Sequence, residues 1–171
     1  VKEPKDLRVI SDIIVNVQGD QPFLDPLMID EAVQPLLDEP DLQMSTLMHP
    51  IAREEDLSDP AVVKVVTNRN GDALYFSRSL IPYPRYNIEH KVYEHVGLYV
   101  YRKEFLLKLA LLPPTLLERI ESLEQLRVLE HGYAIRVIET KVRDNAFSGF
   151  SVDTEDDLRR AEQMLHERGL A

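Results

Sequence analysis

Short apolar runs separated by turn residues constrain the fold of this chain more than any other feature of its sequence. The segments 12–18, 62–67 and 95–102 are rich in Val, Ile or Tyr, as buried strands are. The segments 27–37 and 122–132 instead repeat apolar residues every three or four positions, which is typical of amphipathic helices. This alternation predicts an α/β domain of three layers. Further strands are expected at 43–48, 73–77 and 134–140.

The middle of the chain carries the clearest hairpin signal. The runs 62–67 and 73–77 flank the turn sequence NRNGD, so they are expected to pair as antiparallel strands. The prolines between 80 and 91 indicate a loop. A last helix is expected after Thr154, the predicted N-cap, with Asp157 at N3 in a capping box.

Composition limits the classes of function open to this chain. With 171 residues, one domain is expected, and the net charge of −10 argues against non-specific binding to nucleic acid or anionic membranes. The absence of cysteine excludes disulfides, thiolate nucleophiles and zinc–thiolate sites. No apolar run reaches the ~18 residues of a membrane helix, and no signal peptide is visible. The chain begins at Val1 rather than Met, which is expected of a segment whose start is missing.

Asp20 is the first candidate site residue, because it follows an apolar strand directly in the sequence VNVQGD. A Gly-Asp pair after a strand is often a turn or a helix cap. Alternatively, ligands of α/β sheets bind at the carboxyl ends of strands, where one or two carboxylates can hold Mg²⁺. Asp153 in SVDTEDDL is a second candidate, either as an N-cap or as a partner of Asp20 on one Mg²⁺.

The other polar candidates have both structural and functional interpretations. Arg78 follows a strand, where it is either solvated or suited to bidentate binding of a carboxylate. His95 begins a strand that also carries Tyr99, and a lone histidine is more often structural than catalytic. Glu124 and Gln125 lie early in an amphipathic helix, where such residues usually only face solvent.

Six sequence blocks, in a fixed order, closely resemble the 3-deoxy-manno-octulosonate cytidylyltransferases, also called CMP-Kdo synthetases. The resemblance extends from about Val15 to the last helix, and the blocks with YFSR…IP and LEQLRVL are the most distinctive. The six blocks are VNVQGDQP, DPAVVKVV, NGDALYFSRSLIPYPR, HVGLYVYR, LERIESLEQLRVLEHG and SVDTEDDL.

This resemblance implies a reaction in which CTP and the acidic sugar Kdo give CMP-Kdo and pyrophosphate, a step towards lipopolysaccharide. It implies a cytoplasmic enzyme with a Rossmann-like nucleotidyltransferase domain and a mixed sheet. It also implies a smaller lobe, at about 78–132, that binds sugar and forms a homodimer. Residues 1–171 would be the C-terminal portion of that single domain, with CTP and Kdo as small-molecule partners and with neither nucleic-acid binding nor membrane insertion.

The resemblance also assigns roles to the candidate residues. Asp20 and Asp153 would be the catalytic, metal-binding pair that holds Mg²⁺. The 2-hydroxyl of Kdo would attack the α-phosphorus in line, and no residue stands out as a general base. The expected sugar-binding residues are Gln18, Arg78, His95, Tyr99, Glu124 and Gln125.

Two departures from the family pattern affect these expectations. Glu155 stands where the family usually has Pro, a mild change at the start of a helix. The family begins with a glycine- and arginine-containing phosphate loop followed by βα units, and no such loop occurs in this sequence. At ~30 residues per βαβ unit, roughly 60 to 100 residues of the family pattern are expected to be missing. Residues 1–171 alone are therefore expected to make no CMP-Kdo and to associate through the exposed strand at 12–18.

Two alternatives remain open. A cytidylyltransferase of this type could act on another acidic sugar, such as an amino-Kdo or a sialic acid, because a single change in the pocket can shift the substrate. The chain could also be a non-catalytic binding or dimerisation domain, and the reading frame upstream of Val1 would distinguish this alternative from an enzyme.

Overall fold

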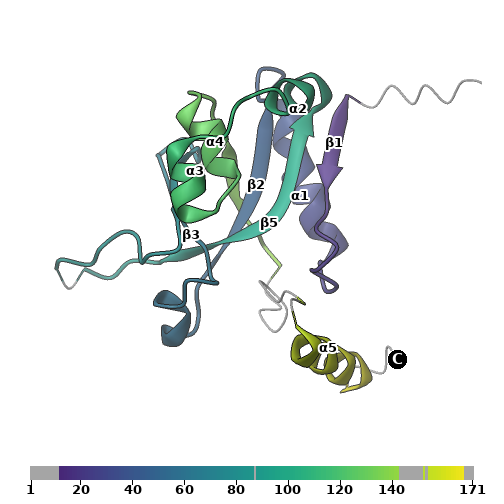
Figure 1. Ribbon diagram of the computed structural model, residues 1–171, viewed down its shortest axis with the longest axis vertical. Helices are drawn as coiled ribbons and strands as arrows, with labels where there is room; N and C mark the ends of the chain where they lie inside the picture. The colour runs from purple at the N-terminus through teal and green to yellow at the C-terminus, as the bar shows by residue number, and fades with distance from the viewer. Residues whose placement is uncertain (1–11, 87, 143–151, 153, 168–171) are drawn as a thin grey trace, which may run out of the picture.

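The computed structural model describes residues 12–86, 88–142, 152 and 154–167. A six-stranded mixed sheet, with strand order β4-β3-β5-β2-β6 and β1 beside β5, forms its centre (Figure 1). The strands are β1 (Ile13–Asn16), β2 (Met44–Pro50), β3 (Lys64–Thr67), β4 (Ala73–Ser77), β5 (Tyr93–Arg102) and β6 (Arg136–Glu139). The helices are α1 (Pro26–Asp38), the 3-10 turn η1 (Glu54–Leu57), α2 (Lys103–Leu109), α3 (Leu116–Glu121), α4 (Gln125–Glu130) and α5 (Glu155–Glu167).

The ten-residue strand β5 organises the sheet, because three other strands pair with it. β2 pairs with β5 on one side. On the other side of β5, β3 pairs with its start and β1 with its end. These pairs are antiparallel, whereas β2 and β6 are parallel. The expected mixed sheet is therefore confirmed, as is the expected hairpin between β3 and β4.

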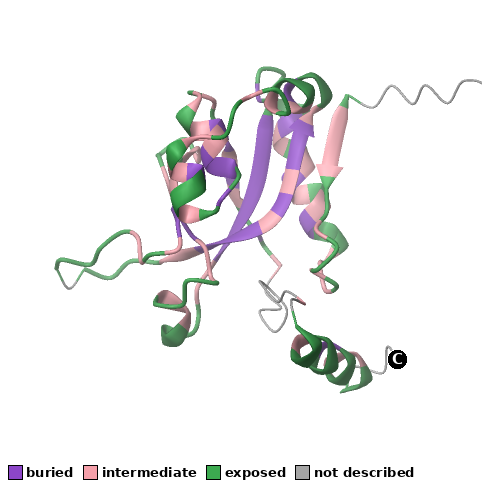
Figure 2. Cartoon of the chain, viewed as in Figure 1, coloured by how far each residue is buried: buried purple, intermediate pink, exposed green. Residues whose placement is uncertain are grey.

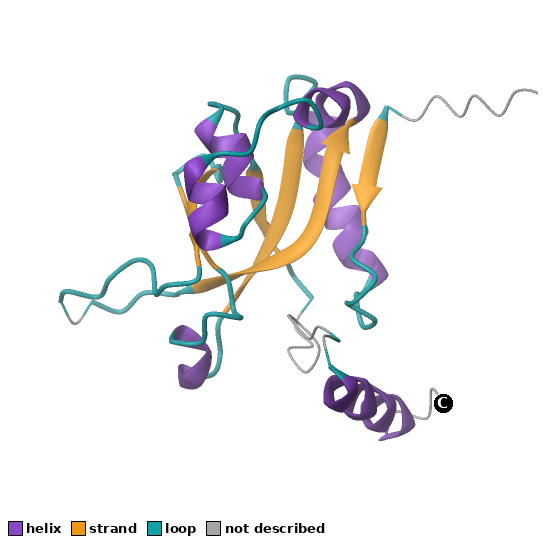
Figure 3. Cartoon of the chain, viewed as in Figure 1, coloured by secondary structure: helices purple, strands orange, loops and turns teal. Residues whose placement is uncertain are grey.

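Helices cover both faces of the sheet, as Figure 3 shows. On one face, Met28, Ala32 and Leu36 of α1 pack against Leu47 of β2 and alternate residues of β5. On the other face, Leu126 and Val128 of α4 pack in a second core. This core also contains Phe105 of α2 and buried residues of the strands β2 to β6. Figure 2 shows that the buried residues concentrate on β2 and β5. The three-layer α/β architecture expected from the sequence is confirmed.

The helix ends follow the sequence signals closely. Asp25 caps α1, since its side chain accepts from the Leu27 amide at 2.8 Å, and Pro26 occupies the first turn. At α5, the Asp157 amide donates to the Thr154 hydroxyl (3.2 Å) while the Asp157 carboxylate accepts from the Thr154 amide (2.9 Å). This is the predicted capping box.

Some elements differ from their predicted extent. The helix expected over 122–132 is the shorter α4, and it is preceded by α3, which was not predicted. They are separated at Ser122, which has a left-handed φ of 53°. The strand expected at 12–18 is four residues long and half-buried, because within the described part of the chain β1 pairs with β5 alone. That this edge drives association stays a prediction.

The range 78–132, expected to form a smaller lobe, contributes β5 to the shared sheet and α2, α3 and α4 to one face. Its role in sugar binding and dimerisation stays a prediction. Among the described residues, no helix has the length and apolar character needed to cross a membrane.

Candidate functional site

The residues after β1 lie over the middle of β5, because β1 runs antiparallel to β5 and Asn16 is paired with Tyr99. A Cβ atom on Gly97 would lie 3.1 Å from the Gln21 amide nitrogen and 3.6 Å from the Gln18 Cγ. Glycine at this position therefore allows the side chains that follow β1 to approach the strand closely.

A cavity of about 380 Å³ opens beside this contact, between β1, β5, α2 and α4. Four predicted sugar-binding residues line it: Gln18, Tyr99, Glu124 and Gln125. They come from three separate parts of the sequence, so the fold brings them together. Its other walls are Ile14, Val15, Asn16, Met44, Tyr101, Leu106, Leu109, Ala110, Arg127 and Val128.

The Tyr99 hydroxyl donates a hydrogen bond to the Gln125 Oε1 at 3.2 Å inside this cavity. Burial raises the pKa of Tyr99 well above its usual value, with smaller contributions from Tyr101 and Glu124. The phenol therefore stays protonated and acts as a donor. Because the Gln125 oxygen accepts this bond, its amide nitrogen can donate to a bound hydroxyl or carbonyl.

His95 is not among the residues that line the cavity, but it packs against two aromatic rings, and one of them, Tyr99, does line it. Its ring centroid is 5.4 Å from that of Tyr99 and 4.9 Å from that of Phe76. The Thr46 hydroxyl oxygen lies 2.9 Å from the His95 Nε2. Burial lowers the pKa of His95 to about 3, so its imidazole is neutral near pH 7.

Arg78 also lies outside the cavity lining, at the end of β4. Its guanidinium donates to three backbone carbonyls: Glu121 (2.8 Å), Pro60 (2.8 Å) and Ser122 (3.4 Å). A guanidinium has five N–H donors, so two are not used by these three bonds. Arg78 thus fixes the end of the hairpin to α3 and keeps some capacity for an anionic group.

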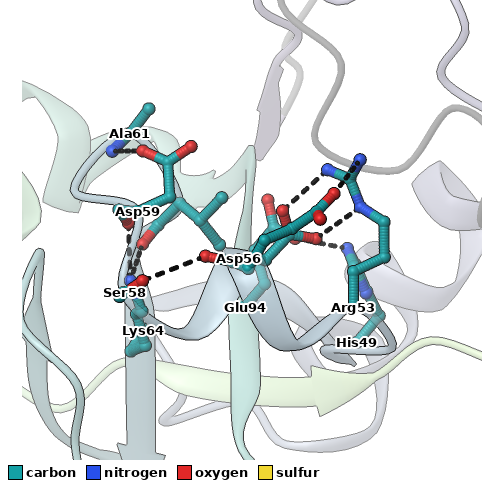
Figure 4. A network of polar contacts seen from close by, with 10 residues as sticks. His49, Arg53, Asp56, Ser58, Asp59, Ala61, Lys64 and Glu94 are labelled. Atoms are coloured by element: carbon teal, nitrogen blue, oxygen red, sulfur yellow. Dashed lines mark hydrogen bonds and ion pairs between the residues drawn. The ribbon is translucent and has the colours of Figure 1, made fainter.

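Figure 4 shows a polar cluster that includes the buried residues Lys64, His49 and Glu94, and Lys64 connects it to the Arg78 backbone. The Lys64 ammonium donates to the carbonyls of Asp59 (2.6 Å), Val62 (2.8 Å) and Arg78 (3.3 Å). Next to it, His49 and Glu94 form an ion pair with 3.2 Å between the Nε2 and a carboxylate oxygen. Burial lowers the pKa of His49, but the nearby Glu94, the Pro50 carbonyl and Asp56 together outweigh burial and raise it overall.

Asp20 is exposed beyond the end of β1. Its carbonyl accepts a hydrogen bond from the Val152 amide at 2.9 Å, so the chain just before Asp153 meets the chain at Asp20. Asp153 itself lies outside the described residues. The described residues contain no group of three or more His, Cys, Asp or Glu arranged to hold a metal. A pair of carboxylates nevertheless fits Mg²⁺, which is usually bound by one or two carboxylates together with waters and phosphates.

Two residues of this region were not predicted from the sequence. Gly97 carries a recognisable signal, since a glycine inside an apolar strand often marks a close approach of another segment. Thr46 carries none, because a threonine in the strand MSTLM is ordinary and only the fold places it against His95.

Comparison with known proteins places this geometry in context. The cytidylyltransferase family model matches residues 3–141. The chain is 51% identical to 3-deoxy-manno-octulosonate cytidylyltransferase of Syntrophotalea carbinolica over 95% of this chain and 66% of that protein. It is 50% identical to the protein of the same name from Pelobacter propionicus, over 91% of this chain and 63% of that protein.

One solved structure gives a close match. It is described as CMP:2-keto-3-deoxy-manno-octonic acid synthetase complexed with CTP, and it superposes with a TM-score of 0.84 at 39% identity. The match covers 94% of this chain and 64% of that one. The chain therefore spans slightly less than two thirds of the length of these relatives.

Proposed function

Because the chain belongs to the cytidylyltransferase family, we propose that the full-length protein transfers CMP from CTP to Kdo and releases pyrophosphate. The observation that carries the proposal is the match, over 94% of this chain, to a synthetase for this sugar solved with CTP. The product would be CMP-Kdo for lipopolysaccharide synthesis, made in the cytoplasm by a homodimer.

The cavity beside β5 suits the sugar in its chemistry. A sugar acid presents many hydroxyl groups, which need paired donors and acceptors in a concave site. Tyr99, Gln125 and Gln18 supply hydroxyl and amide groups there, and Glu124 supplies a carboxylate that accepts hydrogen bonds. Arg78 is the proposed partner of the sugar carboxylate, through the two donors that its carbonyl contacts leave over.

In the proposed reaction, the 2-hydroxyl of Kdo attacks the α-phosphorus in line and pyrophosphate leaves with the bonding electrons. The side chains of the cavity bind and orient the sugar, and positioning supplies much of the acceleration in such transfers. Asp20 and Asp153 would hold Mg²⁺, which when bound neutralises phosphate charge and makes a nearby hydroxyl more acidic.

Replacement of Gln125 by Ala tests the sugar side of this proposal. The KM for Kdo should rise about five- to tenfold, because one net hydrogen bond contributes about 1 kcal/mol, while the KM for CTP should stay within about twofold. Steady-state kinetics of pyrophosphate release by the full-length protein would measure both values. Gln34→Ala, an exposed substitution on α1, is the matched control. A rise in the KM for CTP alone would place Gln125 in the nucleotide pocket instead.

A further inference from the structure

We propose that Thr46 is a positioning residue, which fixes the proton of His95 on Nε2 and so leaves Nδ1 as a hydrogen-bond acceptor. The tautomer follows from contacts among the described residues. Its use towards the sugar rests on the proposed function.

The position of Thr46 results from an irregularity between β2 and β5. Thr46 is paired with Tyr99 whereas Leu47 is paired with Val96, so two residues of β5 bulge out of the ladder. The Thr46 hydroxyl lies in this bulge, 2.8 Å from the Leu98 carbonyl and 3.1 Å from the Val96 carbonyl. Thr46 is fully buried, so no water competes for these contacts.

Counting protons at this hydroxyl assigns the tautomer. A hydroxyl has one proton, and the two carbonyl oxygens can only accept. A proton directed to Nε2 would leave both carbonyls facing the hydroxyl lone pairs, whereas a proton directed to one of the carbonyls lets Nε2 donate as well. The contact of 2.9 Å with the His95 Nε2 must then use the hydroxyl oxygen as acceptor. Consequently Nε2 carries the hydrogen. Because burial keeps the imidazole neutral, Nδ1 has a lone pair and no proton.

The ring orientation is fixed by the same surroundings. Phe76 contacts the imidazole edge-on and Tyr99 packs against it obliquely, at interplanar angles of 75° and 44°. A neutral imidazole held in this way is an acceptor for a hydroxyl, not a cation for a carboxylate. His95 packs against Tyr99, which lines the cavity, and we place a sugar hydroxyl at the His95 Nδ1, where Thr46 would keep the acceptor available without touching the sugar.

The test uses full-length protein labelled with ¹⁵N-histidine, with long-range ¹H–¹⁵N correlation spectra and kinetics on the same samples. The His95 signals are assigned by their loss in His95→Gln. In the wild type, Nε2 should resonate in the protonated range and Nδ1 in the unprotonated range. In Thr46→Val, which keeps the shape but removes the acceptor, the second tautomer should appear. The KM for Kdo should then rise at least about threefold, with the KM for CTP unchanged.

Two controls separate this role from a general packing role. Thr46→Ser keeps the hydroxyl and should restore the wild-type tautomer. Ser45→Ala removes a neighbouring buried hydroxyl that donates to the Ala32 carbonyl on the α1 face, and it should leave His95 unchanged. A wild-type His95 protonated on Nδ1, or a tautomer unaffected by Thr46→Val, would overturn the proposal. A changed tautomer with an unchanged KM for Kdo would support the assignment at Thr46 and overturn the contact between Nδ1 and the sugar.

Discussion

Replacement of Asp20 by Asn in the full-length protein is expected to lower kcat for CMP transfer at least about 100-fold, with little effect on folding. A metal ion that polarises phosphoryl oxygens contributes several kcal/mol, and each 1.4 kcal/mol is a factor of ten in rate. The amide of Asn keeps the shape of the side chain but removes its charge. Asp20 is exposed beyond the end of β1, so the substitution removes no buried apolar side chain from the core.

Asp12→Asn provides a matched control, since Asp12 is also exposed and lies just before the other end of the same strand. It should retain wild-type kcat. Circular dichroism and the urea midpoint of each variant would confirm that the fold is intact. If Asp20→Asn keeps near-wild-type turnover at limiting Mg²⁺, Asp20 is not a metal ligand. Asp153→Asn should behave as Asp20→Asn does, because the proposed ion needs both carboxylates.

Replacement of Phe76 by Ala is expected to destabilise the protein by about 3 to 5 kcal/mol. Phe76 is fully buried in the core between the sheet and α4, and its ring contacts the imidazole of His95. Removing the ring loses apolar burial and leaves a cavity whose walls include the imidazole. The measurement is the free energy of unfolding from urea titration monitored by circular dichroism.

The control for this substitution lies two residues away on the same strand. Leu74 is 61% exposed, so Leu74→Ala should change the free energy of unfolding by less than about 0.5 kcal/mol. A cost below about 1 kcal/mol for Phe76→Ala would mean that the core under β4 is loosely packed. In that case the packing of Phe76 would not determine the orientation of the His95 ring.

Local sequence signals were sufficient for much of the fold. The capping box at Thr154 and the hairpin around Gly71 each depend on residues within a few positions of one another, and both are present. Helix α3 and its end at Ser122 were missed, because a serine in the left-handed region has no clear local signature. The strand at 12–18 was expected to be longer and more buried. Burial depends on strands and helices that are far away in sequence, and β1 has only one partner strand among the described residues.

The candidate site shows the same division. Gln18, Tyr99, Glu124 and Gln125 were named from a family resemblance, and the fold brings them to one cavity. Hydrophobic periodicity alone cannot predict that these residues are close together. Their proximity results from the antiparallel pairing of β1 with β5 and from the packing of α4. The contact of Thr46 with His95 could not be predicted from the sequence, because it depends on the bulge in β5.

The most direct test of the proposed function is an assay of the full-length protein with CTP, Mg²⁺ and a panel of acidic sugars: Kdo, an amino-Kdo and a sialic acid. Pyrophosphate release and the mass of the nucleotide sugar would be measured for each. We expect CMP-Kdo as the product, with kcat/KM for Kdo at least about tenfold above that for the other sugars. Absence of pyrophosphate release with Kdo, or an equal or higher kcat/KM with another acidic sugar, would contradict the proposed function.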